Sequence, residues 1–140
     1  MRLKEKLEGT RDTLQQIKNK NKDVPVIVEG KKDLKALRRL GLEGKIIKIK
    51  TNNTIFHIIE NMRGKYEEVI ILTDWDNTGS RLYHKIKRAC KANGIDYNER
   101  IRKKLIKYLW GEIKDIESLP KFIKRAEKVV INPYNARNKG

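Results

Sequence analysis

Three short apolar runs stand out along the chain, each rich in β-branched residues and bounded by polar or turn-forming positions. They comprise residues 26–28, 46–49 and 69–72. Each run has the length of a strand, and the third is continuous in its apolar character, as strands buried on both faces of a parallel sheet are. A fourth strand is predicted over residues 112–117.

Elsewhere, apolar residues recur every three or four positions, which is the spacing of one helix face. This pattern predicts helices over residues 3–17, 34–40, 55–62, 82–90 and 99–109, and a last one that starts at Ser118 and Pro120. Gly41, Gly64 and Gly94 are predicted to end the second, third and fourth helices, and Asn53 or Thr54 to cap the third. The alternation of strands and helices predicts an α/β fold, with a mainly parallel four-stranded sheet and helices on both faces.

The length of 140 residues fits one domain, because it lies near the commonest domain size. Within it we expect a basic N-terminal helix over residues 1–23 and a core over residues 24–119. A C-terminal helix and tail should occupy residues 120–140, fraying from Asn132 onward.

Charge narrows the class of partner. The chain has 34 Lys and Arg residues against 18 Asp and Glu, a formal net charge of +16. Such a balance favours polyanions, with RNA and DNA ahead of membranes. The alternative, a Lys- and Glu-rich surface of a heat-adapted protein, explains the abundance of charge but not its sign.

The single cysteine, Cys90, cannot form an internal disulfide, and no apolar run approaches the ~18 residues that cross a bilayer. A cytoplasmic protein is the simpler interpretation. Cys90 shares one helical stripe with Ile86 and Ala89, so we predict that it is a small core residue.

Carboxylates follow two of the predicted strands: Glu29 follows the first, and Asp74 and Asp76 follow the third. Ligands of open parallel sheets bind beyond the carboxyl ends of the strands, so we expect these residues to meet there. Three carboxylates at one edge repel each other unless a cation neutralises them. Hard oxygen ligands suit Mg²⁺, so the predicted catalytic and metal-binding residues are Glu29, Asp74 and Asp76, with Mg²⁺ as cofactor.

Two other interpretations use the same aspartates. Asp74 or Asp76 could cap the helix that follows. The run Asp74-Trp75-Asp76-Asn77-Thr78 also resembles the opening motif of haloacid-dehalogenase phosphohydrolases. In that family the motif usually follows the first strand and needs a later lysine and a later acidic pair, for which Asp115 and Glu117 are the candidates.

Residues 26–33, which contain Glu29-Gly30, and residues 69–79, which contain the D-x-D and Gly79, together resemble the Toprim domain. This domain occurs in topoisomerases, bacterial-type primases, old-family nucleases and the nuclease that matures 5S ribosomal RNA. The likeness is closest to small stand-alone archaeal Toprim proteins. It implies a Rossmannoid three-layer sandwich in which Asp74 and Asp76 bind Mg²⁺, and Glu29 binds metal or acts as general acid or base.

Three details qualify the resemblance. Topoisomerases carry Glu after the glycine of the second motif, where Ser80 stands here, so a second metal position lacks support. We therefore expect neither autonomous strand passage, which needs a separate tyrosine-bearing domain, nor priming, for which primases use additional domains. Asp33 matches a frequent acidic position after Glu-Gly, with capping of the 34–40 helix as its alternative.

Basic residues near the motifs are candidates for phosphate contacts. Arg81 is in the first turn after the D-x-D, with Lys85 and Arg88 farther along the same stripe, and its planar guanidinium matches phosphate oxygens. Glycines at the two turns let backbone approach an anion. The predicted phosphate-binding residues are Gly30, Lys31, Lys32, Gly79 and Arg81.

Trp75, between the two aspartates, could stack on an unpaired base, although an aromatic residue at a strand end more often belongs to the core. Two functions remain open. The first is a Mg²⁺-dependent phosphodiester hydrolase, a small RNA- or DNA-processing nuclease. The second is a non-enzymatic nucleic-acid-binding module that serves a protein partner in a larger complex.

Overall fold

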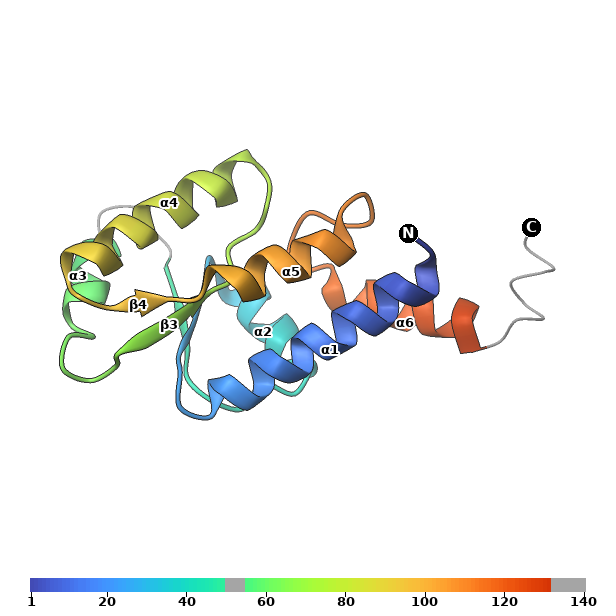
Figure 1. The fold of residues 1–140 in the computed structure, drawn as a ribbon, viewed down its shortest axis with the longest axis horizontal. Helices are drawn as coiled ribbons and strands as arrows, with labels where there is room; N and C mark the ends of the chain where they lie inside the picture. Colours follow the sequence, from blue (N-terminus) through green and yellow to red (C-terminus); the bar gives the residue numbers. More distant parts are fainter. Residues whose placement is uncertain (50–54, 132–140) are drawn as a thin grey trace.

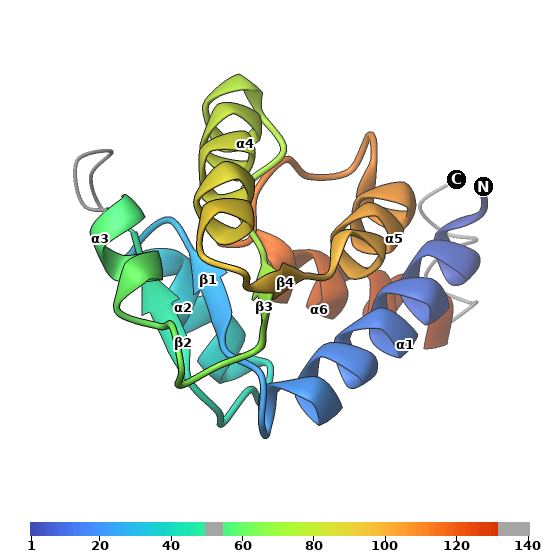
Figure 2. The same ribbon diagram turned by 60° about the vertical axis from the view of Figure 1, so that its left-hand side comes forward.

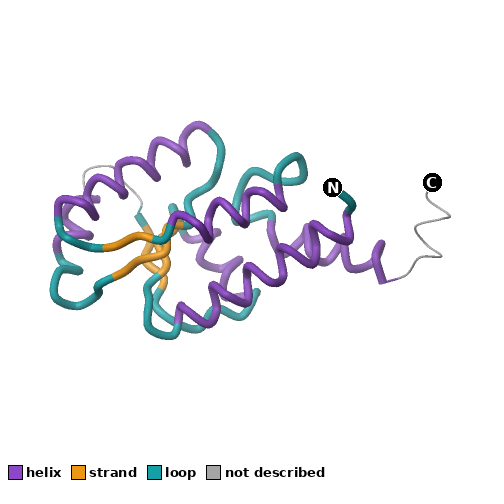
Figure 3. The backbone as a smooth tube through the Cα atoms, in the orientation of Figure 1, coloured by secondary structure: helices purple, strands orange, loops and turns teal. Residues whose placement is uncertain are grey.

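The sheet is parallel throughout. The computed structural model describes residues 1–49 and 55–131. Its four strands are β1 (Val26–Val28), β2 (Ile46–Lys48), β3 (Glu68–Ile71) and β4 (Asp96–Tyr97), in the order β2-β1-β3-β4. Val26 pairs with Ile46 on one side and with Ile70 on the other. The predicted α/β fold with a mainly parallel four-stranded sheet is therefore confirmed (Figure 3).

The fourth strand is not where the sequence placed it. Residues 112–117 form turns, and the last strand of the sheet is Asp96–Tyr97, which pairs with β3. A strand of two residues is too short to contain an apolar run, so the sequence has no strand pattern at this position. The prediction for 112–117 is wrong because this segment bonds to the turn after β3 and not to a strand of the sheet: Trp75 N donates to Lys114 O at 3.1 Å.

Each predicted helix in the described part of the chain is present. They are α1 (Leu3–Asn21), α2 (Lys31–Arg39), α3 (Ile55–Glu60), α4 (Asn77–Ala92), α5 (Glu99–Leu109) and α6 (Leu119–Ile131). Gly41 and Gly94, predicted as helix ends, have φ values of 97° and 66°, in the left-handed region that glycine tolerates best. The proposed caps Asn53 and Thr54, and the tail from Asn132, lie outside the described residues.

The two faces of the sheet bury separate sets of side chains, because successive residues of a strand point in opposite directions. In β1, Val26 and Val28 contribute to one apolar cluster and Ile27 to the other. Helices α1, α2, α5 and α6 cover the first face, and α3 and α4 cover the second (Figures 1 and 2). Cys90 is fully buried in the second cluster, as predicted.

This layering leaves the carboxyl ends of β1 and β3 accessible. Each strand is followed at once by a turn into a helix, α2 after β1 and α4 after β3. The segment after α5 passes beside the turn between β3 and α4 (Figure 2). Glu29, Asp74 and residues 110–118 are therefore brought to the same end of the molecule.

Candidate metal and phosphate site

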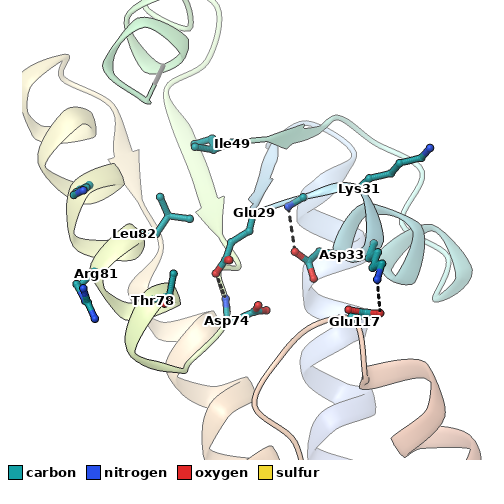
Figure 4. A pocket seen from close by; sticks show the side chains of 12 residues that line it. Glu29, Lys31, Asp33, Ile49, Asp74, Thr78, Arg81, Leu82 and Glu117 are labelled. Carbon is teal, nitrogen blue, oxygen red and sulfur yellow. Dashed lines mark hydrogen bonds and ion pairs between the residues drawn. The ribbon is translucent and has the colours of Figure 1, made fainter. Parts of the chain in front are cut away.

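A hollow of about 750 Å³ lies at the carboxyl ends of β1 and β3. Glu29, Asp33 and Asp74 line it together with four basic residues, which are Lys31, Lys32, Arg81 and Lys85. The acidic groups come from the ends of two strands and the first turn of α2 (Figure 4). As predicted from the topology, two motifs that are distant in sequence meet at one edge of the sheet.

Backbone hydrogen bonds fix the two strand-end carboxylates. Glu29 Oε1 accepts from Asp74 N at 3.1 Å, and Asp74 Oδ1 accepts from Ile116 N at 3.0 Å. Among hydrogen bonds between described residues, the second oxygen of each carboxylate has no donor. Each group is thus held by one oxygen and has the other available for a ligand.

Burial and mutual repulsion make these carboxylates hard to ionise. Burial, with smaller contributions from Asp33 and Glu29, raises the pKa of Asp74 to about 7. Burial is also the largest cause of the raised pKa of Glu29, to which the charges of Asp33 and Asp76 add. The pKa of Asp33 is raised by burial and by Glu117 and Asp115. Protons or a cation are needed to neutralise such a group.

Asp76 differs from Asp74 in what it binds. Its Oδ1 accepts from Gly79 N at 2.7 Å and so caps α4, whereas Asp74 bonds to the segment after α5. The capping interpretation therefore holds for Asp76 and not for Asp74. Gly79 is packed against the same turn, and a Cβ there would collide with the Asp74 carbonyl.

Asp33 also has a capping role, because its Oδ2 accepts from Gly30 N at 3.2 Å at the start of α2. Its side chain is nevertheless buried beside the hollow (Figure 4). The two interpretations of Asp33 are thus compatible: it caps α2 and adds negative charge to the site.

The donor set determines which ion could bind. Within residues 1–49 and 55–131, no group of three or more His, Cys, Asp or Glu side chains is arranged to hold a metal ion by itself. Glu29 and Asp74 do present free carboxylate oxygens to one hollow. Mg²⁺ often uses only one or two carboxylates and completes its shell with water and substrate phosphate. The residues fit an ion shared with a phosphate rather than one enclosed by protein.

Arg102 is a site residue that we did not predict. Its side chain is buried in α5, where Nη2 donates to Asp74 O at 2.8 Å and Nε donates to Thr73 O at 3.2 Å. The guanidinium also lies 4.5 Å from the Tyr83 ring centre. In the sequence, Arg102 follows Ile101 and precedes Leu105 by one turn, so it is a charged residue on an apolar helix face. That position was the signal that could have identified it as a buried, functional arginine.

The segment between α5 and α6 was also missed. It supplies Ile116 N to Asp74, and Glu117 lines the hollow. Lys32 Nζ lies 4.0 Å from Glu117 Oε1, and both side chains are largely exposed, so this ion pair contributes little to stability. A turn that acts through its backbone leaves no residue-type pattern in a sequence.

The other candidates divide between rim and core. Lys31, Lys32 and Arg81 are exposed on the rim, and the Arg81 guanidinium points outward rather than at the carboxylates (Figure 4). Arg88 does not line the hollow. Trp75 is buried and donates from Nε1 to Ile113 O at 2.9 Å, so its predicted place in the core is confirmed.

No helix in the described ranges combines the length and the apolar character that crossing a membrane requires.

Comparisons with known proteins find relatives that span most of this chain. A UPF0292 protein of Methanocaldococcus jannaschii is 34% identical over 89% of this chain and 98% of its own length. A UPF0292 protein of Thermoplasma volcanium is 33% identical over 84% of this chain and 98% of its own. The solved structure of a putative protein from Aquifex aeolicus matches with a TM-score of 0.68 and 28% identity, covering 76% of this chain and 94% of that one.

The family model of the Toprim domain matches residues 24–108, a range that contains both acidic motifs. This match also accounts for the D-x-D-x-T run, whose likeness to haloacid-dehalogenase enzymes is confined to five residues after the third strand. Together with the small archaeal relatives, the match establishes that this chain belongs to the Toprim family.

Proposed function

We propose that the protein is a Mg²⁺-dependent phosphodiesterase that acts on RNA or DNA. The Toprim domain suggests a metal-dependent, nucleic-acid-related function, and such domains typically bind divalent metal ions. Within that class, the observation that carries the proposal is the pair of half-buried carboxylates, Glu29 and Asp74, in a hollow with a basic rim. Acidic groups there suit a cation, and the lysines and Arg81 around them suit phosphate.

The proposed roles follow from position. Glu29 and Asp74, with Asp76 from the adjoining turn, would hold Mg²⁺, which offsets charge on a phosphoryl oxygen when it is bound. Gly30 lines the hollow and would let backbone come close to the phosphate, and Gly79 would act by letting α4 begin close against Asp74. Lys31, Lys32 and Arg81 would supply positive charge around the phosphate.

The alternative role for Glu29 is to act on a proton instead of binding the ion. In hydrolysis, water adds to phosphorus and one bridging P–O bond breaks, while the proton of the water must pass to a base. Burial raises the pKa of Glu29, which brings this carboxylate closer to the range useful for proton transfer at neutral pH. In this role its free oxygen would accept the proton of the attacking water, Asp74 and Asp76 would hold the ion, and the leaving oxygen would take up a proton from solvent.

A second function is supported by the position of Asp76. This aspartate already caps α4, and the described residues contain no three-carboxylate metal group. An inactive member that binds nucleic acid, and that a protein partner recruits into a larger complex, would need no such group. The two functions share a binding surface and differ in turnover.

A cleavage assay with purified protein and Mg²⁺ on RNA and DNA separates these functions. We expect Asp74→Asn and Asp76→Asn to lower turnover by about 100-fold or more, since metal assistance contributes several kcal/mol. Nucleic-acid affinity should be unchanged or higher, because negative charge is removed. Asp12→Asn, the same change at an exposed position of α1, is the matched control. Full activity of the two variants, or of wild type in EDTA, would reject the proposed mechanism.

A further inference from the structure

Trp110 is exposed in an unusual setting. Large apolar side chains exposed in the described part of the chain are Met1, Phe56 and Trp110, and the indole is 68% exposed. Its backbone is fixed at the end of α5, where Trp110 N donates to Ile106 O at 2.8 Å. A single exposed apolar residue is ordinary. What distinguishes Trp110 is the hollow that it lines.

This second hollow, which we call the Trp110 pocket, has a volume of about 440 Å³. It lies between the turn before α4 and the segment after α5, and its wall comprises Trp75, Asp76, Asn77, Trp110, Gly111, Ile113 and Lys114. The wall therefore combines one exposed aromatic face with an amide, a carboxylate and an ammonium group.

The hollow lined by Glu29, Asp33 and Asp74, which we call the carboxylate hollow, and the Trp110 pocket share the turn between β3 and α4. Asp74 and Thr78 line the carboxylate hollow, while Trp75, Asp76 and Asn77 line the Trp110 pocket. A ligand with a phosphate in the first hollow would thus have its neighbouring group next to the second. In a nucleic-acid strand, that neighbouring group is a nucleobase.

We propose that the Trp110 pocket binds an unpaired nucleobase of the strand whose phosphate occupies the carboxylate hollow. This inference rests on the proposed function and specifies its substrate as single-stranded nucleic acid. Every base offers a flat π-face that can stack on an indole, whereas a base inside a duplex already has both faces covered. Lys114 and the net charge of +16 favour a polyanion over an apolar protein surface.

Trp75 has a structural role in the Trp110 pocket. Its indole is buried and its Nε1 donates to Ile113 O, which fixes the segment that carries Ile113 and Lys114. Trp75 therefore supports the wall of the pocket, and the accessible aromatic face belongs to Trp110. The stacking that the sequence allowed for Trp75 is moved to a residue 35 positions later.

The two tryptophans give a direct test by fluorescence, in EDTA so that no cleavage occurs. A short single-stranded oligonucleotide should quench the emission of wild type and should not quench Trp110→Phe, in which the buried Trp75 is the remaining tryptophan. Trp110→Ala should bind that oligonucleotide roughly 5- to 150-fold more weakly, the range for one base stacked on an aromatic side chain. Trp110→Phe should recover part of the affinity.

Two control ligands and a melting experiment test whether weaker oligonucleotide binding by Trp110→Ala comes from lost charge or from misfolding. Inorganic polyphosphate should bind wild type and Trp110→Ala equally, and a blunt duplex should bind both equally. The melting temperature of Trp110→Ala should match wild type, because the indole is exposed.

Each opposite result overturns the proposal. Unchanged oligonucleotide affinity in Trp110→Ala rejects the base pocket and leaves the phosphodiesterase proposal intact. Trp110-dependent binding without Mg²⁺-dependent cleavage keeps the pocket and rejects the hydrolase. Quenching that grows with protein concentration alone would assign the surface to a second copy of the chain. No binding of any polyanion would reject both proposals.

Discussion

The carboxylate hollow and the Trp110 pocket are lined by neighbouring residues of one turn, and each departs from ordinary burial in its own direction. In the first, ionisable groups are partly removed from water, and backbone hydrogen bonds to Glu29 and Asp74 hold them there. In the second, a large apolar ring is left in water on a fixed backbone. Partly buried carboxylates and an exposed indole are both unfavourable in the absence of a ligand. The proposed ligands, a cation with phosphate and a nucleobase, would make both arrangements favourable.

The comparison also indicates a division of work. Under the proposal, electrostatic groups in the first hollow would act on any phosphate and so carry no preference for strand type. The aromatic face in the second would act only on a base that is free to stack. Changes in the first should therefore alter chemistry, metal affinity and salt dependence, and changes in the second should alter the choice between single and double strands.

The largest effect on the fold should come from Arg102, which holds the turn that separates the hollows. Replacing it by Met leaves Thr73 O and Asp74 O without the guanidinium donor and removes a positive charge near Glu29 and Asp74. We expect the free energy of unfolding to fall by about 2–4 kcal/mol. Arg100→Met, at an exposed position of the same helix, is the control. Equal stability of the two variants in urea denaturation would contradict a structural role for Arg102.

The next expected effect is a pH dependence of the stability of the metal-free protein, which arises from Asp74 in the carboxylate hollow. The pKa of Asp74 is about 7 in the fold, above the value near 4 of an unfolded chain. Below about pH 4 both states keep the proton; as pH rises toward 7, the unfolded chain releases it more readily, so the metal-free protein loses stability.

Because Mg²⁺ competes with that proton, its affinity should fall by up to about tenfold for each pH unit below 7. Titration calorimetry between about pH 6 and 8 measures this dependence, and Asp74→Asn should flatten it. An affinity independent of pH in wild type would show that Asp74 does not titrate in this range or does not bind the ion.

A smaller expected effect is on the salt dependence of nucleic-acid affinity, which should differ between variants of the two hollows. If about four to six phosphates are neutralised, the log–log slope of affinity against salt should be near −3 to −5. Arg81→Ala should make this slope shallower by about 1, while Trp110→Ala should lower affinity and leave the slope unchanged. Filter binding over a salt series checks both variants. A salt-independent affinity would contradict electrostatic binding altogether.

Most of the fold could be predicted because local pattern and tertiary structure agree. The apolar runs at 26–28 and 69–72 became β1 and β3, and the sheet topology brought Glu29 to Asp74. The failure at residues 96–97 has a physical cause, because two backbone-paired residues need no apolar run. Their pairing depends on where α4 returns the chain, which is a tertiary property.

For the site, the sequence indicated the strand-end carboxylates and the basic residues at the rim, but not the backbone groups that hold the carboxylates. Strand-end carboxylates are visible in a sequence, whereas Ile116 acts through its backbone N–H and any residue type could do the same. Trp75 and Trp110 illustrate the same limit. Both are tryptophans near polar residues, and only the structure tells which indole is buried and which faces solvent.

The measurement that tests the central claim most directly is thermal melting with Mg²⁺ and with EDTA. At Mg²⁺ ten times its Kd, wild type should be stabilised by about 1.4 kcal/mol, a rise of roughly 2–6 °C in Tm. Asp74→Asn and Asp76→Asn should lose most of this shift without a lower Tm in EDTA, since Asn can still accept the hydrogen bonds of Ile116 N and Gly79 N. Asp12→Asn should keep the full shift. An identical Mg²⁺ shift in wild type and both site variants would contradict the metal assignment.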